Sequence, residues 1–453
     1  MKIILALGWY FPDAFGGTEL YVDGLAQRLK SRGHELTVVA PLRGAESPRN
    51  YEHQKIPVFR YPQPSEDSSR DECQTRVPSR GSEVLLRWLA AQRPDILHLN
   101  TIVPSLSIFE VEAARSLGIR VIATCHLGDL GYLCQRGTLM RWGSEICDGK
   151  VKAIKCAGCG LHAGGVPRIL ATPIATVGRA LGRSASGLPG RMGTVLGMAD
   201  LIRHRQNLQR RLLSALDRFV LLNHAAYERV LLNGAPREKL AINQLGISHV
   251  ILRKPGPQAS PTTLPVRFGY VGRFTAIKGV LDLARAWRAL SPELPVTLDW
   301  IGPTLHQEAR DLQAEAKRIM GNDKRVSFFA AVSSSDIGEL LKRLDVLIVP
   351  SRCFEGGPTV VHESFAAGTP VIGTRIGAMP ELIIDGVNGR LVAPANAPEI
   401  AAAICEIAND PAATVDRWRR ALPPPRTMDE IAADYEKLYE DVLREPLSSA
   451  AQL

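Results

Sequence analysis

Cys353-Phe-Glu-Gly-Gly-Pro-Thr-Val-Val-His-Glu-Ser-Phe-Ala-Ala-Gly-Thr-Pro-Val-Ile-Gly-Thr374 is the stretch around which the rest of the chain is organised. A mostly apolar run precedes it at 344–350 and another lies within it at 370–373, and both are typical of buried parallel strands. Because proline is favoured at the first helical position, a helix is predicted to begin near Pro358. The stretch therefore predicts a strand, a glycine loop, a helix and a second strand.

The start of this helix has the features of an anion site. Unpaired backbone N–H groups and the helix dipole attract phosphate, and Gly356, Gly357 and Thr359 supply such groups around Pro358. Glu355 and Glu363 stand beside them, and carboxylates next to a phosphate need hydroxyl partners such as those of a sugar or a ribose. The alternative is an exposed helix with acids in its N-terminal half.

Two cations form a second candidate site. After the Pro-rich segment 254–265, the run 267–272 reads as a new strand, and Arg273 and Lys278 follow it where a helix opens. An arginine fork and a lysine point charge at this place could clamp a diphosphate. Solvent-facing charges are the alternative, although cations at a helix start oppose its dipole.

These motifs carry a resemblance to a known family. Glu355-x7-Glu363 with Gly368-Thr-Pro after it, the run 377–392, and Gly-Arg-x4-Lys-Gly at 272–279 resemble retaining nucleotide-sugar glycosyltransferases of family 4, the glycosyl transferases group 1. The resemblance is weakest over residues 45–85 and 130–215. It implies an α/β chain of GT-B architecture, with two facing Rossmann-like domains and a central cleft. In the family, the residues matching Arg273 and Lys278 hold the leaving phosphates, and those matching Glu363 and Glu355 hold ribose and donor-sugar hydroxyls.

The N-terminal half begins with a βαβ pattern. A strand is predicted over 2–8, a helix from Gly16-Gly17 to Arg32 and a strand over 35–40, without the Gly-x-Gly-x-x-Gly fingerprint of hydride-transfer enzymes. Gly16 and Gly17 resemble the family's N-terminal glycine loop, which approaches the donor diphosphate or the acceptor. A glycine pair that only permits an unusual turn is equally compatible with the sequence.

His126 is a candidate site residue of this half. It follows the predicted strand 119–124, at the strand end where open α/β sheets place ligand groups. Thr124-Cys-His126 resembles the family's Thr-x-His, which implies a contact from His126 to the donor sugar. Leu127 stands where the family usually has an aspartate. A structural histidine is the alternative.

A chain of 453 residues suggests two domains. We expect an N-terminal acceptor-side domain over 1–250 with an insertion at about 130–215, a linker over 251–265, and a nucleotide-sugar domain over 266–426. The segment 427–453 is expected to be a helix and tail that, as in the family, cross back to the first domain. Residues 47–82 are expected to be irregular apart from a strand at 58–61.

The insertion holds four closely spaced cysteines. Thiolates at such spacing can close a tetrahedral zinc site that folds a glycine-rich segment, and the candidate structural zinc ligands are Cys134, Cys147, Cys156 and Cys159. Buried thiols and a redox pair are the alternatives. No cofactor is expected for catalysis, since in the family protein cations take the place of a divalent ion.

The charge balance favours anionic partners. The net charge is +9, and basic residues interleave with apolar ones over 166–205, a pattern compatible with peripheral contact to an anionic membrane or with a solvated face. Nucleic acid is disfavoured because aromatics are not interleaved. No apolar run reaches 18 residues, and the N-terminus reads as a strand. We therefore expect a cytoplasmic protein that can lie at the inner face of the membrane.

The resemblance implies a retaining hexosyltransferase. It would move a sugar from a nucleotide-sugar, UDP- or GDP-linked, to a hydroxyl of a saccharide or lipid-linked acceptor, in bacterial surface polysaccharide or glycolipid assembly. A nucleotide-sugar epimerase or hydrolase on the same fold is one alternative. A non-catalytic two-domain ligand-binding protein is the other, although it would not need phosphate-clamping cations.

Overall fold

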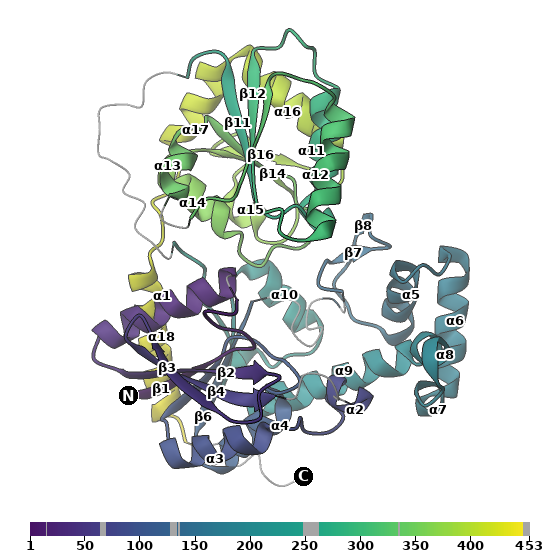
Figure 1. The fold of residues 1–453 in the computed structure, drawn as a ribbon, viewed down its shortest axis with the longest axis vertical. Helices are drawn as coiled ribbons and strands as arrows, with labels where there is room; N and C mark the ends of the chain where they lie inside the picture. The colour runs from purple at the N-terminus through teal and green to yellow at the C-terminus, as the bar shows by residue number, and fades with distance from the viewer. Residues whose placement is uncertain are drawn as a thin grey trace. The chain divides into compact units, whose positions relative to one another are not determined.

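The computed structural model describes residues 1–14, 16–63, 69–126, 134, 136–247, 262–333 and 336–446. The chain forms two compact units, one made of Met1–Gln244 with Met428–Leu453 and the other of Leu245–Thr427 (Figure 1). Most of the expected linker 251–265 lies outside the described residues. Each unit is an α/β layer structure in its own right, as the alternation of strand and helix patterns predicted.

The first unit is built on a sheet of eight described strands in the order β10-β9-β6-β5-β1-β2-β4-β3. All neighbours are parallel except β3 and β4. The strands are β1 (Lys2–Ala6), β2 (Glu35–Arg43), β3 (Arg49–His53), β4 (Ile56–Gln63), β5 (Ile96–Leu99), β6 (Arg120–Cys125), β9 (Arg218–Leu221) and β10 (Leu240–Ile242).

The segment 47–82 is more ordered than expected. It contains β3, the whole of β4 and the short helix α2 (Arg70–Cys73), whereas only a strand at 58–61 was predicted. β4 lies between β2 and β3, and its apolar residues Ile56, Val58 and Phe59 are buried. The expectation was wrong because Pro57 and Pro62 interrupt the pattern, and because β3 is a polar strand held only by pairing with β4.

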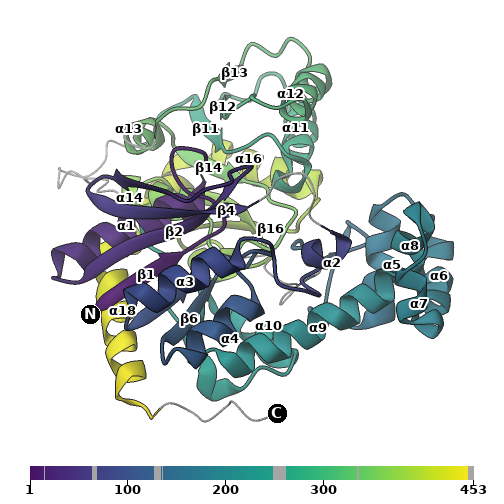
Figure 2. The same ribbon diagram turned by 60° about the horizontal axis from the view of Figure 1, so that its bottom comes forward.

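Helices of the first unit fall into two groups. Those around the sheet are α1 (Gly17–Ser31), α3 (Ser82–Gln92), α4 (Ile108–Ser116), α10 (His224–Leu232), the turn η2 (Arg237–Lys239) and α18 (Met428–Arg444). Those of the insertion are α5 (Ala153–Ala163), α6 (Arg168–Leu181), α7 (Arg183–Ser186), α8 (Gly190–Leu196) and α9 (Met198–Ala215), with the hairpin β7 (Met140–Arg141) and β8 (Glu145–Ile146). Figure 2 shows α5–α8 gathered at one end of α9, away from the sheet. α5, α6 and the start of α9 share a small core, against which Val195 of α8 packs, made of Val151, Ala157, Leu161, Ala171, Ala175, Ala199 and Ile202.

The last helix, α18, completes the first unit through buried polar contacts. The Tyr439 hydroxyl lies 2.7 Å from His98 Nδ1, and His98 Nε2 lies 2.7 Å from Thr124 Oγ1. Thr124 Oγ1 is also 2.7 Å from the Tyr435 hydroxyl, which accepts a bond from Tyr21 of α1. These groups are buried, and their mutual hydrogen bonds offset the free-energy cost of removing them from water.

The second unit has a parallel sheet of six described strands in the order β13-β12-β11-β14-β15-β16. They are β11 (Val266–Val271), β12 (Val296–Ile301), β13 (Val326–Phe329), β14 (Val346–Val349), β15 (Val371–Thr374) and β16 (Gly389–Val392). Helices cover both faces, with α11 and α12 on one side and α13 and α14 on the other in Figure 1. The helices are η3 (Ala276–Lys278), α11 (Val280–Arg288), α12 (Gln307–Met320), α13 (Ile337–Lys342), α14 (Thr359–Ala367), α15 (Met379–Leu382), α16 (Ala397–Asn409), η4 (Ala412–Asp416) and α17 (Arg417–Arg420).

None of the helices in the described parts of the chain is both long enough and apolar enough to cross a membrane.

Candidate active site

Lys278 and Glu355 meet at the carboxyl ends of two neighbouring strands. β11 and β14 are adjacent and parallel, so the loops that follow them leave the same edge of the sheet. Lys278 Nζ donates to Glu355 Oε1 at 2.6 Å, and the Ser351 hydroxyl donates to the same oxygen at 2.6 Å. The Glu355 residue is only 7% exposed, so its carboxylate needs such hydrogen-bond partners.

The two loops that carry this pair are locked together. Gly279 has φ +69°, and a Cβ there would lie 1.8 Å from the Pro350 carbonyl oxygen, so only glycine fits. The Arg352 backbone N–H donates to the Ile277 carbonyl at 2.7 Å. The Arg352 guanidinium also makes two contacts to the buried carboxylate of Asp282 in α11. These contacts fix Lys278 relative to the loop that holds Glu355.

A third loop, after β15, supports Glu355 from the backbone side. The Ala378 N–H donates to the Glu355 carbonyl at 2.9 Å, and a Cβ at Gly377 would lie 2.6 Å from the Glu355 nitrogen and oxygen. The Thr374 hydroxyl donates to the Ser351 carbonyl at 2.8 Å. The carboxylate of Glu355 is therefore held at a fixed place on the sheet edge by contacts from three loops.

Arg273 lies in the same part of the unit. It is exposed and directly follows β11, and the Tyr270 hydroxyl donates to its carbonyl at 2.8 Å. Burial raises the pKa of Tyr270, the charge of Glu355 raises it further, and Arg273 acts in the opposite direction. Tyr270 thus stays a neutral hydroxyl between a cation and a carboxylate.

The helix start that follows Glu355 is open to an anion in the described structure. α14 begins at Thr359 with Pro358 as its N-cap, no side chain caps it, and its first turn has no acidic residue. Gly356 and Gly357 precede it, and a Cβ at Gly357 would overlap the Leu245 side chain. The first-turn N–H groups and the positive end of the helix dipole therefore lie beside the Glu355 loop.

Glu363 is the fifth residue of α14, and burial raises its pKa to about 7. A carboxyl group with this pKa changes charge near neutral pH, and when ionised it accepts strong hydrogen bonds from hydroxyl groups. The neighbouring His362 behaves differently, because burial lowers its pKa to about 4 and keeps it neutral.

In the first unit, His126 follows β6 at the carboxyl edge of the sheet. Its Nε2 lies 3.4 Å from Asn100 Oδ1, and its ring packs edge-on against Tyr21 of α1 at 4.8 Å between centroids. Burial lowers the pKa of His126 to about 4, so the ring is neutral at pH 7. Gly16 is the N-cap of α1 and Gly17 its first residue, one turn before Tyr21. His126 and the glycine pair thus belong to one corner of this unit.

The residues predicted from the sequence make up only part of the candidate site. Lys278, Glu355 and Arg273 surround adjacent strand ends, and the helix start and Glu363 follow on α14. Ser351 and Asn100 were not predicted, although each is a polar residue directly beyond a buried strand, a signal that could have identified it. The Arg352–Asp282 contact has no such signal, since 70 residues separate its members.

The four cysteines of the insertion are free thiols. The Lys152 N–H lies 3.4 Å from the Cys156 sulfur, and the Trp142 N–H lies 3.4 Å from the Cys159 sulfur. Cys134 and Cys147 are near enough for their charges to raise the pKa of Cys156, although burial is the larger cause. Within the described ranges, no three His, Cys, Asp or Glu side chains are arranged to hold a metal ion. The zinc site therefore stays a prediction.

Comparisons with known proteins agree with the fold and with the motifs. Residues 265–410 match the family model "Glycosyl transferases group 1", and residues 16–150 match "Glycosyl transferase 4-like domain". The glycogen synthase of Mycobacterium tuberculosis is 33% identical over 170 residues, which is 37% of this chain and 40% of that protein. N-acetyl-alpha-D-glucosaminyl L-malate synthase of Bacillus anthracis is 27% identical over 184 residues, 39% of this chain and 45% of that protein. The matched region thus spans less than half the length of these curated relatives.

Solved structures are similar over nearly the whole chain. Sucrose-phosphate synthase from Thermosynechococcus elongatus has a TM-score of 0.64 at 17% identity, covering 98% of this chain and 99% of that one. Anabaena Alr3699/HepE in complex with UDP and glucose has a TM-score of 0.63 at 17% identity, covering 97% and 99%. The predicted GT-B fold class, with two Rossmann-like units, is confirmed.

Proposed function

We propose, since this chain belongs to the group 1 glycosyltransferases of family 4, that it transfers a sugar from a nucleotide-sugar donor to a hydroxyl group of an acceptor. One observation carries the proposal, namely the ion pair between Lys278 and the buried Glu355 where the β11 and β14 loops meet. A buried carboxylate paired with a cation at the carboxyl ends of parallel strands can bind the hydroxyl groups of a ligand while the cation binds its phosphates.

The charge arrangement suits departure of a diphosphate. As the bond between the sugar and the phosphate oxygen breaks, negative charge grows on that oxygen. Lys278, Arg273 and the N-terminus of α14 supply positive charge to stabilise it, without any need for a divalent ion. Glu355 would then hold hydroxyl groups of the donor sugar, and Glu363 those of the ribose.

We propose retention of the anomeric configuration, with the acceptor hydroxyl attacking from the face that the diphosphate leaves. A phosphate oxygen of the leaving group would take the acceptor's proton, which keeps the step balanced without a further base. The neutral ring of His126 is suited to donate a hydrogen bond to a donor-sugar hydroxyl. The glycine pair at the start of α1 would let the donor diphosphate or the acceptor approach the backbone closely.

A UDP-sugar is the first donor to test, because a structure with the same fold was solved with UDP and glucose. GDP-sugars are the second. Purified protein should be screened by thermal shift with UDP-, GDP-, ADP- and dTDP-sugars, and the donor that stabilises it should be incubated with and without saccharide acceptors. A transferase yields a glycosylated acceptor with unchanged anomeric configuration. Free sugar or an epimerised donor in the absence of acceptor would favour the hydrolase or epimerase instead, and binding without turnover would favour a ligand-binding protein.

We further propose an acceptor that is a saccharide or is lipid-linked, used at the inner face of a bacterial membrane in surface polysaccharide or glycolipid assembly. The basic and apolar character of the insertion supports this proposal. We also propose that Cys134, Cys147, Cys156 and Cys159 bind a structural zinc ion with no part in the reaction. The N–H groups that point at two of the sulfurs support it, since thiolates in metal sites accept such bonds.

A further inference from the structure

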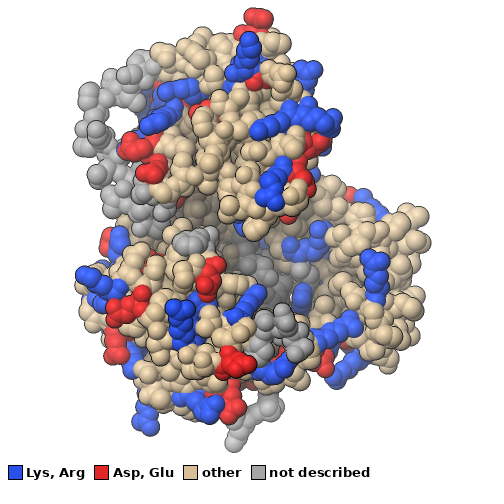
Figure 3. Space-filling view, in the orientation of Figure 1, with Lys and Arg blue, Asp and Glu red and all other residues tan. Residues whose placement is uncertain are grey.

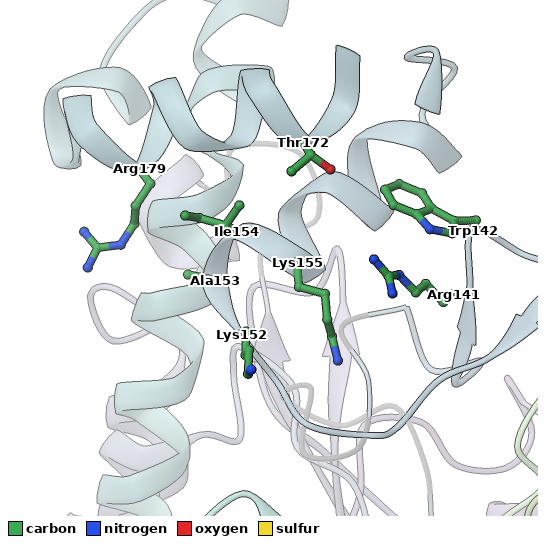
Figure 4. A pocket seen from close by; sticks show the side chains of 8 residues that line it. All are labelled: Arg141, Trp142, Lys152, Ala153, Ile154, Lys155, Thr172 and Arg179. Carbon is green, nitrogen blue, oxygen red and sulfur yellow. The ribbon is translucent and has the colours of Figure 1, made fainter. Parts of the chain in front are cut away.

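A pocket of about 500 Å³ opens on the insertion, apart from the candidate active site. It is formed by the β7 end, the first turn of α5 and the facing side of α6 (Figure 4). Four of its lining side chains are cationic and none is acidic: Arg141, Lys152, Lys155 and Arg179, with Trp142 and Thr172 beside them. A concave surface lined by one sign of charge concentrates the opposite charge.

Most of this positive charge is not neutralised within the protein. Lys155 contacts the carboxylate of Asp148, but in the described part of the chain no carboxylate contacts Lys152 or Arg179. Arg141 packs its guanidinium 5.5 Å from the Trp142 ring centre. Residues 150–199 contain seven Lys or Arg and no Asp or Glu, although Arg168 pairs with Glu145 just before them. Most of the pocket lining therefore belongs to a basic segment, which an anionic surface would complement.

One wall of the pocket, α6, also carries an unusual exposed stripe. Its small residues Ala171, Ala175 and Gly178 face the insertion core. On another face Ile169 is 82% and Val177 53% exposed, and Leu170 and Leu181 of the same helix are also exposed. At about 100° per residue these four positions lie within about one third of the helix circumference, and this apolar sector is the stripe. In Figure 3 the side of the insertion turned to the viewer is mostly tan with blue side chains among them.

We infer that α6 lies on an anionic lipid bilayer, with its apolar stripe at the level of the acyl-chain boundary and a lipid phosphate in the basic pocket. The charge and the stripe select this occupant together. A bilayer offers anionic headgroups next to an apolar layer, which complement a cationic pocket and an exposed apolar stripe on the same helix. A second copy of the chain would bring the same positive charge toward the pocket and be repelled.

This surface of the insertion would make the membrane contact proposed above, and its binding to lipid can be tested separately from the transfer reaction. The full chain should be co-sedimented with phosphatidylcholine vesicles and with vesicles that also contain phosphatidylglycerol. We expect binding to the second kind only, weakened by salt. The pair Lys152→Glu and Arg179→Glu should lower the partition about tenfold or more, as each basic residue near an anionic surface contributes a several-fold factor. Lys324→Glu, an exposed cation of the other unit, is the matched control.

The stripe is tested by Ile169→Glu against Leu305→Glu, because Leu305 is 79% exposed but lies before α12 in the second unit. Only the first should release the protein from vesicles. Two tryptophan variants, Ile169→Trp and Leu305→Trp, exclude loss of the fold as the explanation. Brominated acyl chains should quench the fluorescence of the indole added at position 169 and not that of the indole added at position 305. Equal binding to neutral vesicles, equal effects of the paired variants, or an unquenched Ile169→Trp would overturn the inference. So would binding of free phosphate with no binding of vesicles.

Discussion

Lys278 Nζ lies 2.6 Å from Glu355 Oε1, and the two residues are 77 positions apart in the chain. The cation proposed to hold the leaving phosphates is thus paired with the carboxylate proposed to hold the sugar. Donor binding would replace this ion pair by a cation–phosphate contact and a carboxylate–hydroxyl contact. Until then the contact holds the two side chains in place.

Replacing Lys278 by alanine should lower kcat by about a hundredfold to a thousandfold, the usual effect of removing one group that stabilises developing charge. KM for the donor should change less, because the charge on the leaving oxygen is largest in the transition state. Steady-state kinetics with the donor found by thermal shift measure both parameters. Lys324→Ala removes an exposed lysine of the same unit and should leave both unchanged. Normal turnover by Lys278→Ala would contradict the proposed role.

Gly279→Ala should destabilise the second unit more than Gly386→Ala. Both glycines have a positive φ, +69° and +75°, so each substitution carries a backbone cost of about 1 kcal/mol. Of the two, only Gly279 would bring the new methyl group against the Pro350 carbonyl oxygen, whereas the position at Gly386 is open. We expect an additional loss of about 1–3 kcal/mol at Gly279. Denaturant unfolding of both variants gives the difference, and equal losses would show that the loops move apart freely.

Most strands of both sheets could be predicted from the sequence, because buried parallel strands are short apolar runs. The run 267–272 was expected as a strand and forms β11 (Val266–Val271). By contrast β3 (Arg49–His53) is an edge strand of polar residues, and only its antiparallel pairing with β4 makes it a strand. Such pairing depends on residues that propensity and periodicity do not connect.

Arg273, Lys278 and Glu355 were named as candidates from the sequence, but their contacts and the neighbouring Ser351 were not predicted. Arg273 and Lys278 were expected to clamp a diphosphate, and nothing in the sequence indicated that Lys278 would pair with Glu355. The support from Gly377, whose missing side chain leaves room for the Glu355 backbone, also depends on a tertiary contact. Residue types at strand ends can be read from the sequence, whereas the partners that position them are set by the packing of loops.

Tyr439→Phe should destabilise the first unit by about 1–3 kcal/mol, since it leaves a buried histidine nitrogen without its partner. The Tyr439 hydroxyl lies 2.7 Å from His98 Nδ1, and His98 is fully buried. Thermal or denaturant unfolding measures the loss. Tyr227→Phe removes a hydroxyl from the half-buried tyrosine of α10 and is the control within the same unit. If both variants unfold alike, the polar contacts of α18 do not hold it in place.

The zinc proposal predicts about one zinc ion per chain in protein purified without chelators. Cys156→Ser should lose the metal and destabilise the insertion, because metal binding at such sites contributes directly to folding. Cys405→Ser, in α16 of the other unit, should retain the metal. Metal analysis together with far-UV circular dichroism before and after chelation distinguishes the outcomes. A metal-free wild-type protein with all thiols reactive would refute the site.

Donor affinity should depend on pH through Glu363. Burial raises the pKa of this carboxyl group to about 7, so the free protein holds its proton more tightly than an unfolded chain does. The protonated group favours the folded state at low pH, and this contribution is lost as pH rises from the ordinary glutamate value through about 7. Donor binding has the opposite trend, because only the carboxylate accepts strong bonds from ribose hydroxyls.

We therefore expect the dissociation constant for the donor to rise by about tenfold per pH unit below about pH 7, and to level off above it. Calorimetric titrations measure this dissociation constant between pH 5.5 and 8.5, which is roughly 1.5 units on each side of the Glu363 pKa. His126 and His362 should not interfere, since burial holds the pKa of each at about 4. Glu363→Gln should bind the donor more weakly, and its affinity should not depend on pH. Its free energy of unfolding should stay constant between about pH 4.5 and about pH 7, the range in which the wild type loses stability. An unchanged pH profile in Glu363→Gln would mean that another group controls donor binding.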